Sequence, residues 1–364
     1  GYLQVSDMLP WARLQDLRKE VDALLSSTTL QHDVRSRLLR GRRALSRLHK
    51  DAQGLPSDAQ GMRWKPTSYG RRMLLGRLTA AGSSMQPMPN LLRQWLYRGL
   101  LHDLDFENCH PCFMLGLVKK HRPQTWERDA PRLAHYVAHR HAFLDEVACH
   151  YELPGAGHKA GRDLAKLGIL VAMNGGELTY WRKKAKSPVS PLKPELPSLL
   201  QLQREARWVR DTIVFVESAF AACLPALLEK IRAQRSTCGR TEEELRRSAF
   251  AYALGHLESM AVDAARGVLE RHGFRATSLL YDGWLATHSP DGVVLAQAMR
   301  EAEAAAETAI GMGGLNVLTL KEGDMYGLPA FSLADKCERT STRAGQRLGP
   351  HDDGHLQQSD EEEE

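Results

Sequence analysis

Apolar residues recur at three- and four-residue intervals along most of the chain, the spacing of helices that bury one face. The pattern predicts two helices within residues 11–50, helices over 125–151, 158–176, 198–234 and 242–273, and an alanine-rich helix ending near Ile310. Asn174 to Gly176 and Gly273 follow the last apolar positions of two of these segments and predict their C-terminal ends. The chain is therefore rich in helix.

Short apolar runs bounded by turn residues predict the strands. They lie around Asp103 and Asp105, on both sides of Asp282-Gly283 within residues 277–288, and over 315–320. Residues 51–68 are predicted to be a connector, and 180–197 a Lys/Pro-rich loop without regular structure. Helices and hairpin-linked strands together predict an α+β protein.

Asp103 and Asp105 are two residues apart in a strand, so both carboxylates point to one side while Leu104 and Phe106 point to the other. Two anions at this spacing repel each other unless a cation lies between them or water solvates both. An edge strand with an acidic outer face is the plain alternative. Asp282-Gly283 predicts a tight hairpin turn, which by itself needs no chemistry.

The predicted helix over 242–273 carries one apolar stripe, which includes Leu254, Leu257, Ala261 and Val268. Such a stripe predicts packing against the core. Glu258 is expected to point away from it and to be free for another role.

Overall composition is that of a globular protein, with 43% hydrophobic and 26% charged residues among 364. No apolar run is long enough for a membrane span, and we expect a soluble, intracellular protein without membrane contact. The net charge is +5, but residues 336–364 contain four Lys/Arg and eight Asp/Glu, a net of −4, which leaves +9 for residues 1–335. A basic body suits a polyanionic partner.

Six cysteines are too few and too scattered for a disulfide scaffold. Cys109 and Cys112 have the spacing of a redox motif or of half a zinc site, without a second Cys-x-x-Cys. Two buried, reduced thiols are the plain alternative.

Four segments, in order, resemble the polymerase region of family A DNA polymerases, the bacterial DNA polymerase I type, over residues 42–320. LTAAGSSMQPMPNLLR resembles the segment before the catalytic strand, and HDLDFENCHP resembles motif A with its metal-binding Asp. Arg162-x-x-x-Lys166 resembles motif B, the helix that holds the triphosphate. LLYDGWLATHSP resembles motif C, with Tyr281-Asp282-Gly283 in place of the family's His-Asp-Glu.

The resemblance implies a right-hand polymerase fold, with an antiparallel palm sheet, helical fingers and a helical thumb. Residues 1–60 would be thumb-like, 61–124 and 241–330 the two parts of the palm, 125–240 the fingers, and 331–364 a disordered acidic tail. Basic residues before position 50 would then hold the duplex.

The resemblance also implies the reaction and its residues. Two Mg²⁺ ions, or Mn²⁺, would be bound by Asp105 and Asp282, with Asp103 accessory. A nucleoside triphosphate and a primer-template are the implied ligands, while protein partners stay unspecified. The implied nucleotide contacts are Arg162, Lys166, His110, Leu170 and Asn174, and the implied nucleic-acid contacts are Arg77, Gln86 and Arg93.

Our first hypothesis is a template-directed nucleotidyltransferase, a DNA polymerase. A single-subunit RNA polymerase shares the palm, and His110 is not the residue with which the family gates the sugar. Loss of the motif C His and Glu suggests a catalytically inactive nucleic-acid-binding relative. A thiol oxidoreductase at Cys109 and Cys112 is a fourth hypothesis, which requires an exposed Cys109 with a lowered pKa.

Overall fold

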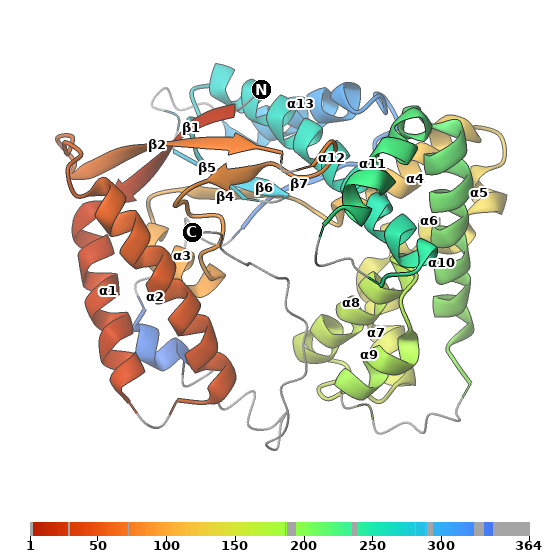
Figure 1. Ribbon diagram of the computed structural model, residues 1–364, viewed down its shortest axis with the longest axis horizontal. Helices are drawn as coiled ribbons and strands as arrows, with labels where there is room; N and C mark the ends of the chain where they lie inside the picture. Colours follow the sequence, from red (N-terminus) through yellow and green to blue (C-terminus); the bar gives the residue numbers. More distant parts are fainter. Residues whose placement is uncertain are drawn as a thin grey trace.

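The computed structural model describes residues 3–27, 30–71, 73–185, 187, 194–234, 239–280, 282–287, 289, 294–323 and 331–337. Two antiparallel sheets lie in the upper half of the view in Figure 1, with the helices α12 (Glu242–Arg271) and α13 (Leu295–Ala309) next to them, and further helices lie below on two opposite sides. The prediction of an α+β protein with antiparallel sheets is confirmed.

The first sheet has the order β1-β2-β3, with β1 Leu3–Pro10, β2 Met62–Gly70 and β3 Thr79–Ala81. β1 pairs with β2 along its whole length, from Leu3 opposite Tyr69 to Pro10 opposite Met62. The connector expected over 51–68 was therefore wrong from Met62 onward, and β1 adds a strand that the sequence did not predict to the region expected to be helical and thumb-like. Polar residues within both strands, including a buried Asp7 and a buried Lys65, conceal the strand pattern.

Two helices follow β1 as predicted, α1 Trp11–Ser26 and α2 His32–Ala52. With α3 Asn90–Tyr97 they enclose a core that includes Leu14, Leu17 and Leu45. Leu333 and Cys337 are buried in the same core, so the expectation of a disordered tail from 331 was wrong for residues 331–337. Residues 338–364 lie outside the described part of the chain.

The second sheet has the order β5-β6-β4-β7 and is antiparallel throughout. Its strands are β4 His102–Phe106, β5 Ala276–Leu279, β6 Gly283–Ala286 and β7 Leu320–Glu322. β4 lies between two neighbours, which rules out the alternative of an acidic edge strand. The strand expected over 315–320 begins only at Leu320, because the preceding backbone amides bond the Glu307 carboxylate rather than a sheet neighbour.

The chain between β4 and β5 is helical and forms most of the rest of the molecule (Figure 1). In chain order they are α4 Cys109–His121, α5 Trp126–Asp129, α6 Pro131–Ala138, α7 Arg140–His150, α8 Lys159–Met173, α9 Leu178–Lys184, α10 Pro197–Trp208, the π-helix η1 Val209–Glu217, the 3₁₀-helix η2 Ala219–Cys223, α11 Leu224–Arg232 and α12 Glu242–Arg271; α13 Leu295–Ala309 follows β6.

The helix α9 occupies the start of the segment expected to be a loop over 180–197. Trp181 is buried, and its indole N–H donates to the Leu164 carbonyl on α8 at 3.1 Å. This tertiary contact stabilises a helix that the Lys- and Pro-rich sequence around it does not suggest.

Within the described residues, no single helix has the length and apolar character needed to cross a bilayer. Only the pair Pro197–Glu217 and Ala219–Arg232, bent by 77° at its break, meets those two criteria jointly.

Candidate active site

Three aspartates converge where β4 meets the β5–β6 hairpin. Leu104 and Phe106 are buried on the opposite face of β4, so Asp103 and Asp105 share the other face, as predicted. Asp282 lies in the hairpin turn, and its carbonyl oxygen accepts a hydrogen bond from the Phe106 amide at 3.0 Å. The strand register places Asp105 opposite Gly283, so the carboxylates of Asp105 and Asp282 come within hydrogen-bonding reach.

Gly283 permits this close approach. A Cβ at this position would lie 2.0 Å from the Leu104 carbonyl oxygen and 2.9 Å from the Asp105 Cα. No side chain can occupy such a space without moving β6 away from β4. The strand spacing itself therefore excludes a second hairpin carboxylate, and Asp103 is the acid that remains beside the pair.

The electrostatics of these acids are those of crowded anions. Asp105 is exposed at the mouth of the site, yet partial loss of hydration, followed by the Asp282 carboxylate and then Asp103, raises the pKa of Asp105 to about 8. Loss of hydration is also the first cause that raises the pKa of Asp103, with Arg93 opposing the shift. A divalent cation relieves both the repulsion and the lost hydration, and clustered carboxylates suit a hard cation such as Mg²⁺.

A cavity of about 290 Å³ opens at the three carboxylates. Its lining also includes Gln86, Asn90, Arg93, Lys321 and Gly323, which lie before α3, on α3, on β7 and just after β7. Gln86 and Arg93, expected from the sequence to contact nucleic acid, thus lie at the aspartates. The Gln86 side chain bonds the backbone at Ala80 and Leu78, and Arg93 donates to the Met88 carbonyl at 2.6 Å.

Asn90 and Lys321 were not anticipated from the sequence. Lys321 lies opposite Asp105 in the sheet, and its Nζ is 3.7 Å from a Glu107 carboxylate oxygen. Its position follows from the pairing of β4 with β7, which joins residues more than two hundred positions apart. Only a prediction of that pairing could have found it.

Glu258 carries a second cluster beside the aspartates. Its side chain is completely buried, with the Arg77 Nε 2.7 Å from one carboxylate oxygen and the His110 Nε2 2.9 Å from the other. The expectation that Glu258 points away from the core and is free was wrong. A buried carboxylate needs partners of this kind, and Arg77 and His110 provide them. Arg77 also interacts electrostatically with Asp282.

Cys109 lies against the same acid. Its Sγ is 3.7 Å from Glu258, and Cys109, His110 and Glu258 have ligand atoms within 4.8 Å of one another. These donors would suit a softer metal than Mg²⁺, but the Arg77 guanidinium already neutralises the carboxylate. Burial and then Glu258 raise the pKa of Cys109 well above its usual value, and Cys112 is buried as well. The thiol oxidoreductase hypothesis is therefore wrong, and the plain alternative of two buried, reduced thiols holds.

Helix α8 brings one of its two predicted phosphate ligands toward the aspartates. Lys166 is close enough to oppose the upward shift of the Asp105 pKa. Arg162, one turn earlier, donates from Nε to the Asp145 carboxylate on α7 at 2.8 Å. In this arrangement the Arg162 guanidinium is engaged in an ion pair with Asp145 rather than directed at a phosphate site.

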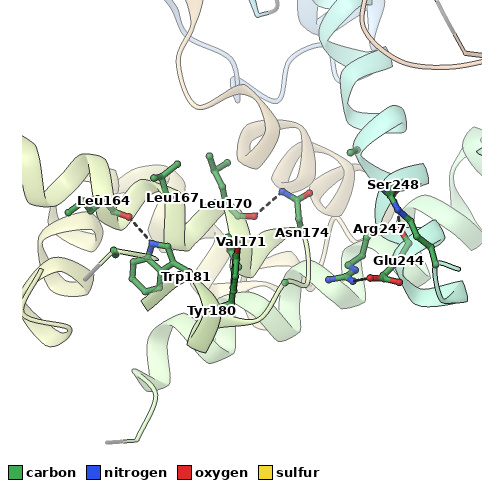
Figure 2. A pocket seen from close by; sticks show the side chains of 14 residues that line it. Leu164, Leu167, Leu170, Val171, Asn174, Tyr180, Trp181, Glu244, Arg247 and Ser248 are labelled. Carbon is green, nitrogen blue, oxygen red and sulfur yellow. Dashed lines mark hydrogen bonds and ion pairs between the residues drawn. The ribbon is translucent and has the colours of Figure 1, made fainter. Parts of the chain in front are cut away.

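Leu170 and Asn174, also on α8, line a larger cavity of about 750 Å³ between α8, α9 and the start of α12. Figure 2 shows Leu164, Leu167 and Leu170 along one wall, with Arg247 and Glu244 at the other side. The Asn174 amide donates to the Leu170 carbonyl at 2.8 Å and so closes the helix end. None of the three aspartates lines this cavity, so it is a separate, mostly apolar hollow. Tyr281, the remaining member of the predicted hairpin tripeptide, lies outside the described residues.

Comparisons with known proteins place this geometry in a known fold. No protein-family model matches the sequence, and neither does any curated protein. Among solved structures, the chain is similar to the POL domain of Pol1 from M. smegmatis in complex with DNA primer-template and dNTP, with a TM-score of 0.53 and 13% identity over 88% of this chain and 67% of that one. At this identity the likeness concerns the fold alone. The chain therefore has a polymerase-like α+β fold.

Proposed function

We propose that this protein is a template-directed nucleotidyltransferase, a DNA polymerase that uses two-metal-ion phosphoryl transfer. The observation that carries the proposal is the convergence of Asp103, Asp105 and Asp282 from adjacent strands, with two of the carboxylates in hydrogen-bonding reach. Carboxylates that clamp a pair of hard cations are a recurring device for phosphoryl transfer. The likeness to a polymerase domain supports it.

In the proposed mechanism, Asp105 and Asp282 would hold two Mg²⁺ ions, or Mn²⁺, and Asp103 would supply the third carboxylate. Such ions, when bound, activate the primer 3′-hydroxyl and stabilise the leaving pyrophosphate. The chain contributes the placement of the acids: β4 and β6 fix their separation, and Phe106 fixes the hairpin turn through the Asp282 carbonyl.

The proposed nucleotide site faces these acids from α8 and α4. Lys166 binds the triphosphate, and His110, held by Glu258, contacts the sugar. Arg162 would bind the phosphates beside Lys166 after breaking its ion pair with Asp145. Only the Arg162 side chain has to move for this. Leu170, further along α8, and Asn174, which caps it, line the apolar hollow rather than the aspartate cavity, and in this proposal the base pair being formed reaches them there.

The proposed nucleic-acid path begins at Arg77, Gln86 and Arg93 around the aspartates and extends to the helix pair α1 and α2. Residues 1–60 act as the thumb, 61–124 and 241–330 as the palm, and 125–240 as the fingers. In support, α2 exposes a row of arginines: Arg35, Arg37, Arg40, Arg42, Arg43 and Arg47. Such rows bind phosphate backbones irrespective of sequence.

Extension of a labelled primer on a template with Mg²⁺ and dNTPs tests the proposal. Asp282→Asn keeps the side-chain shape but removes a charge from the cation clamp, so we expect extension to fall by about a thousandfold or more. Asp263→Asn, on the exposed side of α12, is the matched control and should extend primers at the wild-type rate. Equal extension by the wild type and Asp282→Asn would exclude the mechanism.

Two related functions give different outcomes in the same assay. An RNA polymerase-like enzyme incorporates NTPs in preference to dNTPs in direct competition. A catalytically inactive relative, which Gly283 and the paired Arg162 favour, binds primer-template in a salt-dependent way but incorporates nothing with Mg²⁺ or Mn²⁺.

A further inference from the structure

We propose that Asp7 is a positioning residue for the hairpin that carries Asp282, a role that rests on the proposed function. Asp7 belongs to β1, far from the motifs in sequence, and its side chain is completely buried. Three hydroxyl groups from two other strands donate to its carboxylate. A buried acid with this set of partners acts as a directional clamp between the two sheets.

The contacts of Asp7 reach the hairpin directly. Ser278 of β5 donates to the carboxylate at 2.5 Å, and Thr67 of β2 donates at 2.7 Å. The Tyr69 hydroxyl donates to Asp7 at 3.3 Å and accepts a hydrogen bond from the Leu279 amide, also at 3.3 Å. Two consecutive residues of β5 are thus held by the first sheet.

The hairpin needs this support because its own pairing is irregular. β5 is an edge strand of its sheet and only four residues long. Its register against β6 shifts between Ala276 and Ser278, as in a β-bulge. A bulge leaves a short strand free to slip or twist, so the ladder alone does not fix Ser278. Asp7 bonds the residue that follows the irregularity.

The cost of burying the Asp7 carboxyl group also indicates that this residue serves to position β5. Removing a carboxyl group from water is unfavourable, and an apolar side chain would join the two sheets without that penalty. What an apolar contact lacks is direction: two hydrogen bonds hold the Asp7 carboxylate against β2, and the third, from Ser278, sets the position of β5 relative to β1 and β2. Burial raises the pKa of Asp7, while the hydroxyl donors and Lys65, itself buried, oppose that shift.

Asp282 follows Ser278 by four residues, and the turn between them is short. The Leu280 amide donates to the Gly283 carbonyl at 2.9 Å, so the turn moves as a unit with β5. On its other side β6 is paired with β4. A shift of β5 therefore twists the turn and separates Asp282 from Asp105, and a misplacement of about 1 Å lowers a catalytic rate by up to about a hundredfold.

Single-nucleotide addition and Mn²⁺ binding by the full chain test the role of Asp7. In Asp7→Asn, and more mildly in Ser278→Ala, we expect kcat to fall about ten- to hundredfold and the Mn²⁺ affinity, followed by electron paramagnetic resonance, to fall in parallel. The Kd for primer-template should stay within about twofold of the wild type, because the duplex contacts are elsewhere. A purely structural role would lower the melting temperature without changing Mn²⁺ affinity in the folded protein.

Glu205→Gln provides the matched control. Glu205 is another buried acid, but it accepts hydrogen bonds from the Arg132 and Leu133 amides at the start of α6. The Glu205→Gln variant should have a lower melting temperature than the wild type but the same kcat and Mn²⁺ affinity. Ser278→Ala, which removes one hydroxyl group, serves if Asp7→Asn does not fold.

The outcomes separate this inference from the proposed function. If the wild-type protein extends primers and both Asp7→Asn and Ser278→Ala keep its kcat and Mn²⁺ affinity, the positioning role is wrong and the polymerase proposal stands. If the wild-type protein neither extends primers nor binds Mn²⁺, the proposed function fails, and the role of Asp7 falls with it.

Discussion

At the scale of single residues, a proton and a metal ion compete for the Asp105 carboxylate. Asp105 has a pKa of about 8 because loss of hydration and its acidic neighbours disfavour the charge. Its ordinary value is 3.8. Since the folded pKa is raised, the contribution of Asp105 to metal-free stability is fully present below pH 3.8 and is lost as the pH rises through about 8.

Metal binding should therefore expel a proton at neutral pH. We expect about one proton to be released per protein when Mg²⁺ or Mn²⁺ binds near pH 6.5, and almost none above pH 9. Calorimetric titration in buffers of different ionisation enthalpy measures this number. In Asp105→Asn the release should disappear, and the metal-free variant should resist unfolding above pH 8 better than the wild type. A binding heat independent of the buffer would contradict this account.

At the scale of elements, the site depends on how closely β6 approaches β4. Motif C, which the hairpin resembles in sequence, has an acid where this chain has Gly283. The backbone geometry gives a reason for glycine, because a Cβ would meet the Leu104 carbonyl oxygen at 2.0 Å. The distance between β4 and β6 therefore leaves room only for glycine at position 283.

Restoring the acid should fail for the same reason. We expect Gly283→Glu to lower primer extension at least tenfold and to lower the melting temperature, because β6 must move and Asp282 moves with it. Gly283→Ala should show the same loss without adding charge. Gly267→Ala on α12, where the nearest atom is 3.9 Å from the added Cβ, should be as active as the wild type and slightly more stable. Higher activity in Gly283→Glu would show that the pairing tolerates a side chain.

At the scale of the whole molecule, charge is separated along the chain. Residues 336–364 are acidic, and the rest of the chain is basic. The arginines of α2 are exposed on the far side of the helix pair from its buried leucines. In Figure 1 this pair lies on one side of the molecule and α7 to α9 on the other, with the two sheets across the top. A duplex held by α2 would thus approach the aspartates along the sheets.

The affinity for duplex DNA should depend on the exposed arginines of α2. Replacing Arg40 and Arg43 together by glutamine should weaken primer-template binding and reduce the slope of log Kd against log salt by about two, roughly one unit per lost phosphate contact. The maximal rate at saturating DNA should stay unchanged, because neither residue lies at the aspartates. Lys230→Gln combined with Arg300→Gln, two exposed cations on α11 and α13, is the charge-matched control. An equal loss in both double variants would assign the effect to net charge.

Local signals in the sequence determined much of this protein. Periodicity placed α1, α2, α8, α12 and α13, and alternation put Asp103 and Asp105 on one face of β4. Asp-Gly placed the hairpin turn at Asp282. These features depend on residues a few positions apart, so a linear pattern contains them.

Contacts between distant segments decided the rest. β1 and β2 form through pairing across more than fifty residues, and a buried Asp7 or Lys65 is tolerated only where that pairing supplies partners. The same holds for Glu258, whose helical position suggested an exposed residue but whose partners Arg77 and His110 come from other parts of the chain. The unfavourable burial of a polar side chain is offset by hydrogen bonds to residues far away in the sequence, and no local pattern predicts those partners. For that reason the sequence could point to the three acidic positions of the candidate site, while the partners of the buried polar groups around them were decided by the tertiary structure alone.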